Sequence, residues 1–512
     1  MFNFSFVATV ILLYIGLLFL IALWTEKSAQ AGRNPSNHPL VYSLSLAVYC
    51  TSWTYYGSVG KAANSGLLFL AIYLGPTLAI VFWGTLLRRM VALKNVHHVT
   101  SIADFISLRY DKSQAVAALA TVIALVGITP YLALQLKAVF STFEMLTLYG
   151  DPARTWMGRY VESLVVGLMI LFTIVFGARR LDPTERHQGV VMAVAVESLV
   201  KLAAFLAVGL FVTYSLYGGF GDIFRRAAEK GVSLFPPGTP GPGASYLTWT
   251  SYLVLAMSAI MFLPRQFHVA VVENFHERHI RTAMWVFPLY MLVINIFVVP
   301  IALAGLLAGH PAAQADLFVL RLPMDSGLGW LTLLVFLGGF SAATAMIMVN
   351  TMTLATMVTN HLLLPLVTYL KPFGFLRRHM LECRWLAVAL GILTGYWFER
   401  ILGKSYLLVN IGLISFAAVL QFAPPIIGGL LWRGGSKAGA LGGMGAGFLV
   451  WAYTMLVPTF VQSGWLPLTL LQDGPFGLTF LAPESLFGLS FDPVSHTVFW
   501  SLTANLGLYV LG

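Results

Sequence analysis

Residues 45–60 read Ser45-Leu-Ala-Val-Tyr-Cys-Thr-Ser-Trp-Thr-Tyr-Tyr-Gly-Ser-Val-Gly60, and they decide the kind of fold that we expect. With its flank the segment covers residues 39–60, which is enough for a helix that needs ~20 residues to cross a bilayer. Its centre nevertheless carries small and hydroxyl side chains, and glycines follow at 57 and 60. A membrane helix can unwind at such a place and turn its main-chain carbonyls and amides toward a ligand. Close packing between helices uses the same residue types, so both interpretations are open.

The rest of the chain has the composition of a membrane protein. Hydrophobic residues are 58% of 512, charged residues are 10%, and the mean hydropathy is +0.82. A soluble protein of this length would need a far more polar surface. Apolar runs of ~20 residues therefore predict an all-α transmembrane fold of about thirteen helices. We place these spans at 4–24, 39–60, 66–87, 114–147, 160–178, 188–217, 247–272, 282–308, 328–358, 385–401, 405–432, 437–460 and 494–512.

The basic residues indicate how these helices are oriented. The formal net charge is +10, and Lys and Arg lie mainly in short loops between apolar runs, which is typical of a membrane protein rather than a nucleic-acid-binding one. With the N-terminus outside, 18 of them fall in inner loops, 9 in outer loops and 3 within spans, which make up the total of 30. We therefore predict a multi-pass protein of a bacterial cytoplasmic (inner) membrane, with the N-terminus outside and the C-terminus inside. The two cysteines, Cys50 and Cys383, suit neither a disulfide framework nor a cysteine zinc site.

Two further spans carry unusual residues. The seventh contains Pro264-Arg-Gln-Phe-His-Val-Ala-Val-Val-Glu-Asn274, where the proline removes a helix hydrogen bond and charged side chains follow. The ninth contains Gly338-Gly-Phe-Ser-Ala-Ala-Thr344, which is again small and hydroxylic. Such spans, well separated in sequence, are typical of transporters with a site at the midplane. Residues 218–246 and 461–493 are too polar and too rich in Pro and Gly to span, so we expect them to be external.

Together these stretches resemble the sodium/solute symporter family over nearly all 512 residues. The most telling stretch is Gln421-Phe-Ala-Pro-Pro-Ile-Ile-Gly-Gly-Leu-Leu-Trp-Arg433, followed by Gly439-Ala-Leu-Gly-Gly443. The resemblance implies a LeuT-like core of two inverted five-helix repeats with broken helices. It divides the chain into a first helix with an inner loop at 1–38, a first repeat at 39–217, an external loop at 218–246, a second repeat at 247–432, and additional helices at 433–512.

A narrower resemblance concerns signalling. The seventh-span motif at 264–274 and residues 341–344, with the outer tail at 483–488, resemble the transporter-like N-terminal portion of CbrA- and CrbS-type sensor histidine kinases. In that subfamily a cytoplasmic kinase module follows. The last apolar run reaches Gly512 without a basic stop, so we expect a longer native chain. The 512 residues carry neither a phosphoacceptor histidine in a soluble helix nor an ATP-binding segment, and we expect no enzymatic activity from them.

The family resemblance also implies a place for a coupling ion. In the family, sodium lies between carbonyls of the broken second span and two neighbouring hydroxyls on the ninth. By position, the hydroxyl pair falls on Ser341 and Ala342, so one hydroxyl is missing, and Thr344 is one turn from Ser341. A hard cation needs about five or six oxygen ligands, so the expected Na+ site, at Ala47, Cys50 and Ser341, is weakened. The carbonyl candidates are Ala47, Val48, Tyr49, Cys50 and Thr51.

Two charged residues within the sixth span could replace the ion. Glu197 and Lys201 are four residues apart and share a helix face, and Glu197 falls near the family's acidic residue on that helix. Ionisable groups at membrane depth are costly and usually functional. Three interpretations are open: proton coupling, a fixed ammonium standing where sodium would, or a structural ion pair that locks two helices.

Aromatic and polar side chains on three spans predict a pocket for a small organic solute. A cavity-facing Lys137 would favour a carboxylate, but this lysine could equally snorkel or pair with a helix end. Arg265, His268 and Glu273 form either a gate or signal relay, or the interfacial anchor of the seventh span. The candidate substrate-binding residues are Ser52, Trp53, Tyr55 and Tyr56 on the second span, Gln135 and Lys137 on the fourth, and Arg265, Gln266 and His268 on the seventh.

The leading hypothesis is a transporter-like domain that binds and translocates an amino acid or short carboxylate and acts as the sensory input of a two-component histidine kinase. Its partners would be the solute, the lipid bilayer, a response regulator reached through the kinase module, and a second copy in a homodimer. The alternative is a stand-alone sodium- or proton-coupled symporter, and no cofactor is expected beyond Na+ or H+. An intramembrane enzyme is poorly supported, because no nucleophile elbow and no His/Glu metal pair at helical spacing occurs.

Overall fold

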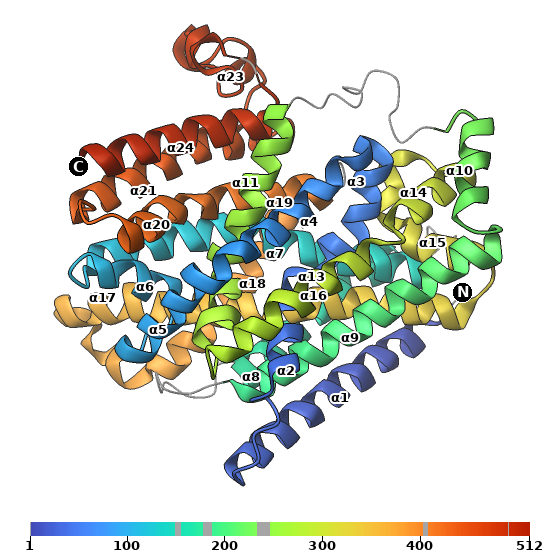
Figure 1. Cartoon of the computed structure of the whole chain (residues 1–512), viewed down its shortest axis with the longest axis horizontal. Helices are drawn as coiled ribbons and strands as arrows, with labels where there is room; N and C mark the ends of the chain where they lie inside the picture. The colour runs from blue at the N-terminus through green and yellow to red at the C-terminus, as the bar shows by residue number, and fades with distance from the viewer. Residues whose placement is uncertain (1, 149–154, 178–186, 233–245, 403–407, 490) are drawn as a thin grey trace.

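The protein, whose structure is a computed structural model, is a bundle of helices. The structure describes residues 2–148, 155–177, 187–232, 246–402, 408–489 and 491–512. Every regular element in these ranges is a helix, and they contain no strand. The first helix, α1 (Phe4–Gln30), lies along one edge of the bundle, and α21 (Lys437–Trp451) and α24 (Pro493–Leu511) lie together along the other (Figure 1).

The first half of the chain consists of helices joined by short π- and 3-10-helical turns. After α1, the elements through the first predicted external segment are α2 (Pro39–Ser45), η1 (Leu46–Tyr49), η2 (Trp53–Gly57), α3 (Ser58–Ser65), η3 (Gly66–Leu70), α4 (Ala71–Ala79), η4 (Ile80–Phe82), η5 (Trp83–Leu87), α5 (Arg88–His97), α6 (Ile102–Arg109), α7 (Gln114–Leu148), α8 (Thr155–Gly177), α9 (Gln188–Leu210), η7 (Phe211–Leu216) and α10 (Phe220–Glu229).

The second half is built in the same way. Its elements are α11 (Tyr246–Phe262), α12 (Pro264–Phe267), η8 (His268–Val272), α13 (Arg278–Asn295), α14 (Val298–Leu307), η9 (Ala312–Leu317), α15 (Phe318–Asp325), α16 (Gly329–Val358), η10 (Thr359–Leu363), α17 (Leu364–Tyr369), η11 (Lys371–His379), α18 (Met380–Leu402), α19 (Leu408–Val419), η12 (Leu420–Phe422) and α20 (Ala423–Leu431), followed by α21, η13 (Ala452–Leu456), α22 (Val457–Gln462), α23 (Thr469–Gln472), three 3-10 turns and α24.

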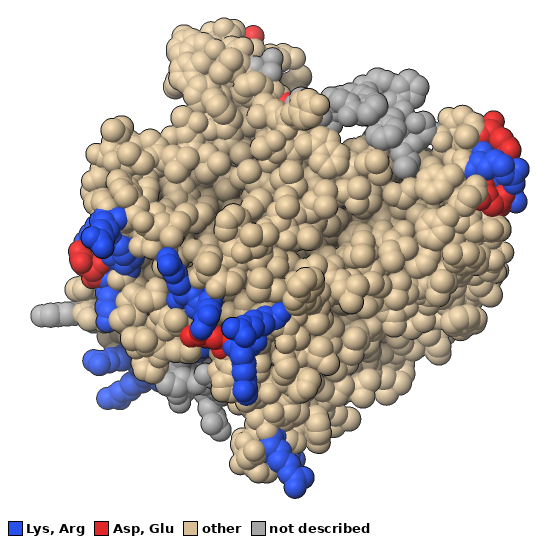
Figure 2. Space-filling view, in the orientation of Figure 1, with Lys and Arg blue, Asp and Glu red and all other residues tan. Residues whose placement is uncertain are grey.

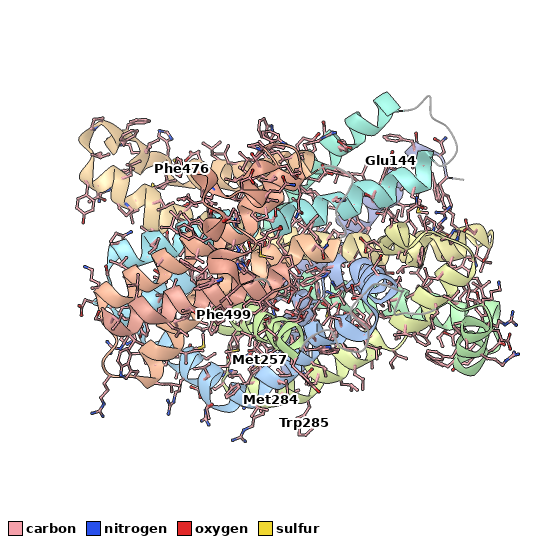
Figure 3. All side chains as sticks on the ribbon, turned by 90° about the horizontal axis from the view of Figure 1, so that it is seen from above. Glu144, Met257, Met284, Trp285, Phe476 and Phe499 are labelled. Carbon is pink, nitrogen blue, oxygen red and sulfur yellow. The ribbon has the colours of Figure 1, made fainter. Side chains whose placement is uncertain are left out.

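The outer surface of this bundle suits a bilayer. Eight helices in the described ranges are long and apolar enough to cross a membrane, and the bent pair of α11 with α12 and η8 adds a ninth if it is one span. Large apolar side chains face outward, such as Trp285, which projects from the edge of the bundle and is 81% exposed (Figure 3). Charged side chains gather at opposite ends of the visible face and leave a broad uncharged band between them (Figure 2). A multi-pass membrane fold is therefore confirmed, whereas the count of thirteen, the orientation and the division into repeats stay predictions.

The second predicted span is broken at mid-length, as its sequence predicts. The helix of α2 and η1 ends at Cys50, whose ψ of 92° is extended, and the π-helical turn η2 resumes at Trp53. Side chains satisfy the amides of the break: Trp53 N donates to Thr51 Oγ1 at 3.2 Å, and Ser52 N donates to Gln135 Oε1 at 3.2 Å. Because hydroxyl and amide groups accept these bonds, the chain can leave the helix without exposing its main chain to lipid.

The seventh predicted span is also broken, at Leu263. Its ψ of 129° interrupts the helix, and Pro264 starts α12 in the first helical position, where a missing N–H is harmless. The axis bends by 48° between the two parts. The proline motif therefore marks a real break, which brings Arg265 and Gln266 to the start of a new helix in the interior.

The ninth predicted span, by contrast, is one continuous helix, α16. A Cβ added at Gly338 would lie 2.6 Å from Tyr55 Oη, and one at Gly339 would lie 1.8 Å from Tyr56 Oη. The two glycines are therefore needed because two tyrosines of the second span lie directly against α16. Of the two interpretations of the small residues, close helix packing is the one that the structure supports here.

The predicted external segments contain no long apolar helix in their described parts. The amphipathic stretch at 222–230 forms α10, where Asp222 pairs with Arg225 at 2.6 Å and with Arg226 at 2.9 Å. The segment at 461–493 contains only short helices and turns, including α23. The Pro- and Gly-rich residues 233–245 lie outside the described residues.

Candidate functional site

The amino group of Lys201 lies at the break of the second span. Lys201 projects from α9, and its Nζ donates to the carbonyl oxygen of Ala47 at 2.7 Å and to that of Cys50 at 2.6 Å. The lysine is 1% exposed. These are the two carbonyls that the family resemblance assigned to a weakened sodium site. An ammonium group therefore stands between them, which is the second of the three interpretations drawn from the sequence.

Glu197 lies one turn before Lys201 and makes separate contacts. Its Oε1 accepts a hydrogen bond from Thr344 Oγ1 at 2.6 Å, and its main-chain carbonyl accepts one from Ser341 Oγ at 3.0 Å. Ser341 Oγ in turn accepts from Tyr14 Oη on α1 at 2.9 Å. Glu197 and Lys201 attract each other electrostatically, but no ion pair within 4 Å joins them in the described part. The two predicted hydroxyls thus bind Glu197, and the predicted ion pair is not a direct contact.

Ser52, Trp53 and Gln135 come together as predicted. Gln135 Oε1 accepts from Ser52 Oγ at 2.7 Å, and the ring of Trp53 packs edge-on against Phe416 with centroids 4.7 Å apart. Tyr131 completes the group, since its hydroxyl lies 3.1 Å from Thr51 Oγ1. Tyr131 was missed, although it precedes Gln135 by four residues and so lies on the same helix face. Phe416 on α19 had no comparable signal.

Arg265 is fully buried in the same region. Its guanidinium carbon lies 4.5 Å from the centre of the Tyr131 ring, which is a cation–π contact. None of its three nitrogens has a hydrogen-bond acceptor among the described residues, and the side-chain oxygen of neighbouring Gln266 has no donor. A buried cation without hydrogen bonds is energetically costly, and its planar fork of N–H groups matches a carboxylate.

The other predicted substrate-binding residues lie apart from Arg265. Tyr55 and Tyr56 pack beneath α16, and their hydroxyls have no partner in the described ranges. Lys137 is partly buried, and its charge interacts with Asp316 on η9 and Glu399 on α18. The sequence left open a cavity-facing lysine or one that snorkels or pairs with a helix end, and it did not predict these two acidic neighbours.

His268 belongs to a second cluster, at the end of η8. Glu273 Oε1 lies 3.1 Å from His268 Nε2 and 3.0 Å from His187 Nδ1, and the main-chain N–H of His187 approaches the same oxygen at 3.3 Å. Burial alone would raise the pKa of Glu273, but hydrogen bonds and positive charge from the two imidazoles hold that pKa below its usual range. His187, which directly precedes α9, was missed because no spacing rule connects it with residues 268 and 273.

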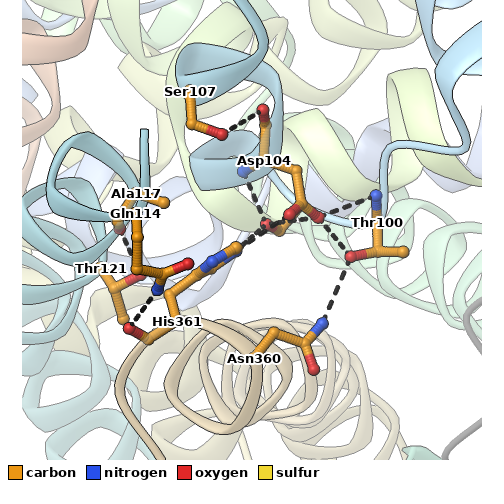
Figure 4. Close-up of polar contacts among 9 residues, drawn as sticks. Thr100, Asp104, Ser107, Gln114, Ala117, Thr121, Asn360 and His361 are labelled. Carbon is orange, nitrogen blue, oxygen red and sulfur yellow. Dashed lines mark hydrogen bonds and ion pairs between the residues drawn. The ribbon is translucent and has the colours of Figure 1, made fainter. Parts of the chain in front are cut away.

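A third polar cluster joins α6 to η10 (Figure 4). Asp104 Oδ1 lies 3.1 Å from His361 Nε2, and Thr100 N donates to Asp104 Oδ2 at 3.0 Å. Gln114 Nε2 donates to the carbonyl of His361 at 2.8 Å. Burial raises the pKa of Asp104, but the bonds from His361 and Thr100 outweigh this and lower it. The cluster ties the loop after α5 to the end of α16.

Comparisons with known proteins place this geometry in a wider context. No family model matches the chain. The uncharacterized symporter YhjB of Bacillus subtilis (strain 168) is 23% identical over 422 residues, which cover 79% of this chain and 79% of that protein. A Na+-coupled sialic acid symporter, solved in a substrate-bound outward-open state, has a TM-score of 0.62 at 12% identity and covers 100% of this chain and 99% of its own. A manganese transporter of Eremococcus coleocola has a TM-score of 0.49 at 16% identity, which is too distant to carry an argument.

The structural similarity covers the whole chain and confirms the fold class. The chain is an all-α transmembrane bundle of the LeuT type with broken helices. In such folds the breaks lie near the midplane and supply main-chain and helix-end groups to ligands. Lys201 contacts the break of the second span, and Arg265 directly follows the break of the seventh.

Proposed function

We propose that this membrane transporter binds a small organic anion at the break of the seventh span and does not need sodium at the break of the second. The observation that carries the proposal is the contact of the Lys201 ammonium with the carbonyls of Ala47 and Cys50. Short carboxylates and amino acids are the solutes that fit, because both present a carboxylate of the size and charge that Arg265 can bind.

The oxygen atoms that could bind a sodium ion at the first break already have hydrogen-bond partners. The ammonium group of Lys201 already donates to both carbonyls, and the Ser341 hydroxyl already bonds to Tyr14 and to the Glu197 carbonyl. A sodium ion would have to displace these groups to find the five or six oxygens it needs. Glu197 Oε2 has no hydrogen-bond partner among the described residues. We therefore propose the proton as the coupling ion, with Glu197 as its carrier.

The buried positive charges of Lys201 and Arg265 favour a negatively charged solute. Lys201 and Arg265 are both buried and repel each other, while the Glu197 carboxylate, which attracts Lys201, is bound to Thr344. A solute carboxylate beside Arg265 would compensate this surplus and accept the hydrogen bonds that the guanidinium lacks. The rings of Trp53, Tyr131 and Phe416 would form apolar walls, as small-molecule sites usually have.

Uptake by purified protein in proteoliposomes tests the proposal. Radiolabelled short carboxylates and amino acids are presented with sodium or with choline as the only added cation, with and without an inward proton gradient at fixed membrane potential. We expect uptake of at least one such anion without sodium and faster uptake with the proton gradient. Uptake that stops without sodium and ignores the proton gradient would contradict the proposal.

A matched pair of lysine variants isolates the role of the ammonium. Lys201→Met should abolish uptake, because the carbonyls lose their cation. Lys61→Met should keep it, since Lys61 is also a buried lysine but its Nζ lies 3.3 Å from Tyr252 Oη rather than at the carbonyls of Ala47 and Cys50. Equal loss in both variants would show that any buried lysine matters only for folding.

A sensory role is the second candidate, and the contacts of α24 favour it. Tyr509 on this last helix lies 2.8 Å from the hydroxyl of Tyr110, which also donates to the carbonyl of Pro425 on α20. A shift of α20 would therefore move α24. If the native chain continues into a kinase module, as the resemblance implies, solute should change its autophosphorylation in native membranes, and Tyr509→Phe should weaken that response while leaving uptake intact. A full-length chain without a kinase module would end this candidate.

A further inference from the structure

We infer that His187, His268 and Glu273 form a binding site for a divalent transition metal ion of the zinc type, which clamps the start of α9 to the end of η8. One ligand atom from each residue lies within 4.8 Å of the other two. Two of the three residues are buried, and His187 is partly exposed, which leaves a path for an ion from solvent. His268 directly follows α12, the helix that starts at the second break, but no part of the proposed solute or proton site uses the three ligands.

The distances suit a metal with small adjustments. Two ligands at a tetrahedral zinc ion, each about 2.0–2.1 Å from the metal, are about 3.4 Å apart. The Glu273 oxygen is 3.0 Å from His187 Nδ1 and 3.1 Å from His268 Nε2, so each of these two pairs must open by about 0.3–0.4 Å. The two imidazole nitrogens lie within 4.8 Å of each other and must come to about 3.4 Å at the metal. Side-chain rotations at residues 187 and 273 can supply that, since residue 187 precedes its helix and residue 273 follows one.

The chemistry of the ligands favours zinc over a hard cation. Two imidazole nitrogens and one carboxylate oxygen are a common zinc ligand set, whereas Mg²⁺ and Ca²⁺ prefer oxygen ligands alone. Glu273 Oε2 is buried and has no partner in the part of the chain that the structure describes. It is therefore free to serve as a second carboxylate ligand, and water entering beside His187 could complete the shell. A divalent ion would also compensate the buried negative charge of Glu273.

Because the site joins α9 to η8, a bound metal would restrain the movement of these two elements. α9 carries Lys201 and Glu197, while η8 continues α12, the short helix that begins with Pro264 and carries Arg265. A metal bonded to residues of both elements would hold their inner ends together and oppose any movement of one break relative to the other. We therefore expect the bound metal to slow transport, and this consequence, unlike metal binding itself, rests on the proposed function.

Cobalt spectroscopy of the purified full chain in detergent tests the binding. After treatment with a chelator, Co²⁺ should produce visible d–d absorption that saturates at one ion per chain, and Zn²⁺ should displace it. His268→Gln and Glu273→Gln should each weaken Co²⁺ binding by at least ~10–100-fold, the range expected when a metal shell is disrupted. Absorption that is absent in the wild type, or unchanged in these variants, would overturn the site.

Two variants separate metal binding from folding. His187→Cys replaces one ligand by another, so it should retain Co²⁺ and add thiolate-to-cobalt charge-transfer absorption, which the wild type lacks. Asp104→Asn changes the other buried histidine–carboxylate contact, which has no second histidine, and should leave Co²⁺ binding unchanged. Charge-transfer absorption in the wild type would mean that Cys50 or Cys383 binds the ion, and would also overturn the site.

Transport assays then test the clamp. Micromolar Zn²⁺ should reduce anion uptake in the wild type, and the reduction should disappear in Glu273→Gln and persist in Asp104→Asn. Cobalt binding by a protein that transports no anion would leave the site standing and reject the proposed function. Anion uptake by a protein that binds no cobalt would do the reverse.

Discussion

Each of the two broken spans lies beside a buried cation, but the two cations are bonded in opposite ways. At the first break, Lys201 donates to two carbonyls at 2.7 and 2.6 Å, so both the cation and the interrupted backbone are satisfied. At the second, Arg265 lies against the face of Tyr131 and has no hydrogen-bond acceptor within the described ranges. At the first break the cation has hydrogen-bond acceptors without a ligand, whereas at the second break it has none in the described ranges.

This difference separates a structural cation from a binding one. A buried group whose hydrogen bonds are made contributes to stability, while one left unpaired lowers it until a ligand arrives. The first break should therefore resist change in every step of a transport cycle, and the second should respond to the solute. Four predictions test this contrast.

Lys201→Met should have the largest effect on stability. Removing the ammonium takes a donor from each of two buried carbonyls, at about 1–3 kcal/mol for each. Thermal unfolding of the detergent-solubilised protein should show a large fall in the transition temperature. Lys61→Met is the matched control and should show a much smaller fall. An unchanged transition in Lys201→Met would remove the basis of the comparison.

Arg265→Met should act in the opposite direction on the solute-free protein. Replacing an unpaired buried charge by an apolar side chain of similar volume should stabilise it by about 1–4 kcal/mol, while anion uptake falls ~100-fold or more, as for the loss of a charged contact worth about 2–5 kcal/mol. Arg265→Lys should rescue uptake only weakly, because lysine lacks the planar fork. A destabilised Arg265→Met protein would mean that the guanidinium has partners without solute.

Thr344→Val tests the hydrogen bonding of Glu197, which lies one turn from Lys201 beside the first break. It removes the 2.6 Å bond to the Glu197 side chain, which should cost about 0.5–1.5 kcal/mol, the usual net contribution of a hydrogen bond. Thr351→Val on the same helix is the control, since Thr351 bonds only to main-chain carbonyls of its own helix. Proton-driven uptake should change only in Thr344→Val. Equal behaviour of the two variants would argue against a special role for Glu197.

Asp104→Asn should have the smallest effect, about 1 kcal/mol, because the asparagine side-chain oxygen can still accept a hydrogen bond in place of the carboxylate. The pKa of Asp104 is lowered in the folded protein, so its contribution is fully present above the unfolded value of ~3.9 and is lost as the pH falls through the folded value. Unfolding of wild type and variant should thus differ at neutral pH and converge in acid. A difference that grows in acid would contradict the assigned pKa direction.

Much of the framework could be predicted because its signals are local. The interruption at residues 50–52 and the bend at Pro264 follow from hydroxyl-rich and proline-containing segments within apolar spans, and the partnership of Ser52 with Gln135 joins two residues already suspected. The charges at Glu197 and Lys201 were conspicuous because they interrupt an apolar helix. The continuous helix α16 shows the limit of this reasoning, since glycines for packing and glycines for unwinding look alike in sequence.

The partners across helices could not be predicted. Tyr14 meets Ser341 across 327 residues of sequence, and His187 meets Glu273 across 86. Neither contact leaves a periodic pattern, because each depends on how separate helices pack. The same applies to Lys137, whose acidic neighbours Asp316 and Glu399 are on two other elements. The sequence showed which side chains needed a partner, and only the packing could show which partner each one has.

Because the cation between Ala47 and Cys50 is attached to the chain by covalent bonds, its local concentration is the same whatever the surrounding salt. A bound ion transfers free energy to a transport cycle only if it enters on one side and leaves on the other. On the proposed function, a tethered ammonium group stays in place throughout the cycle, so a sodium gradient would do no work at that position. With such a site, the protein could bind its solute or equilibrate it across the membrane at any sodium concentration. Accumulation of the solute against its gradient would then need coupling to another ion.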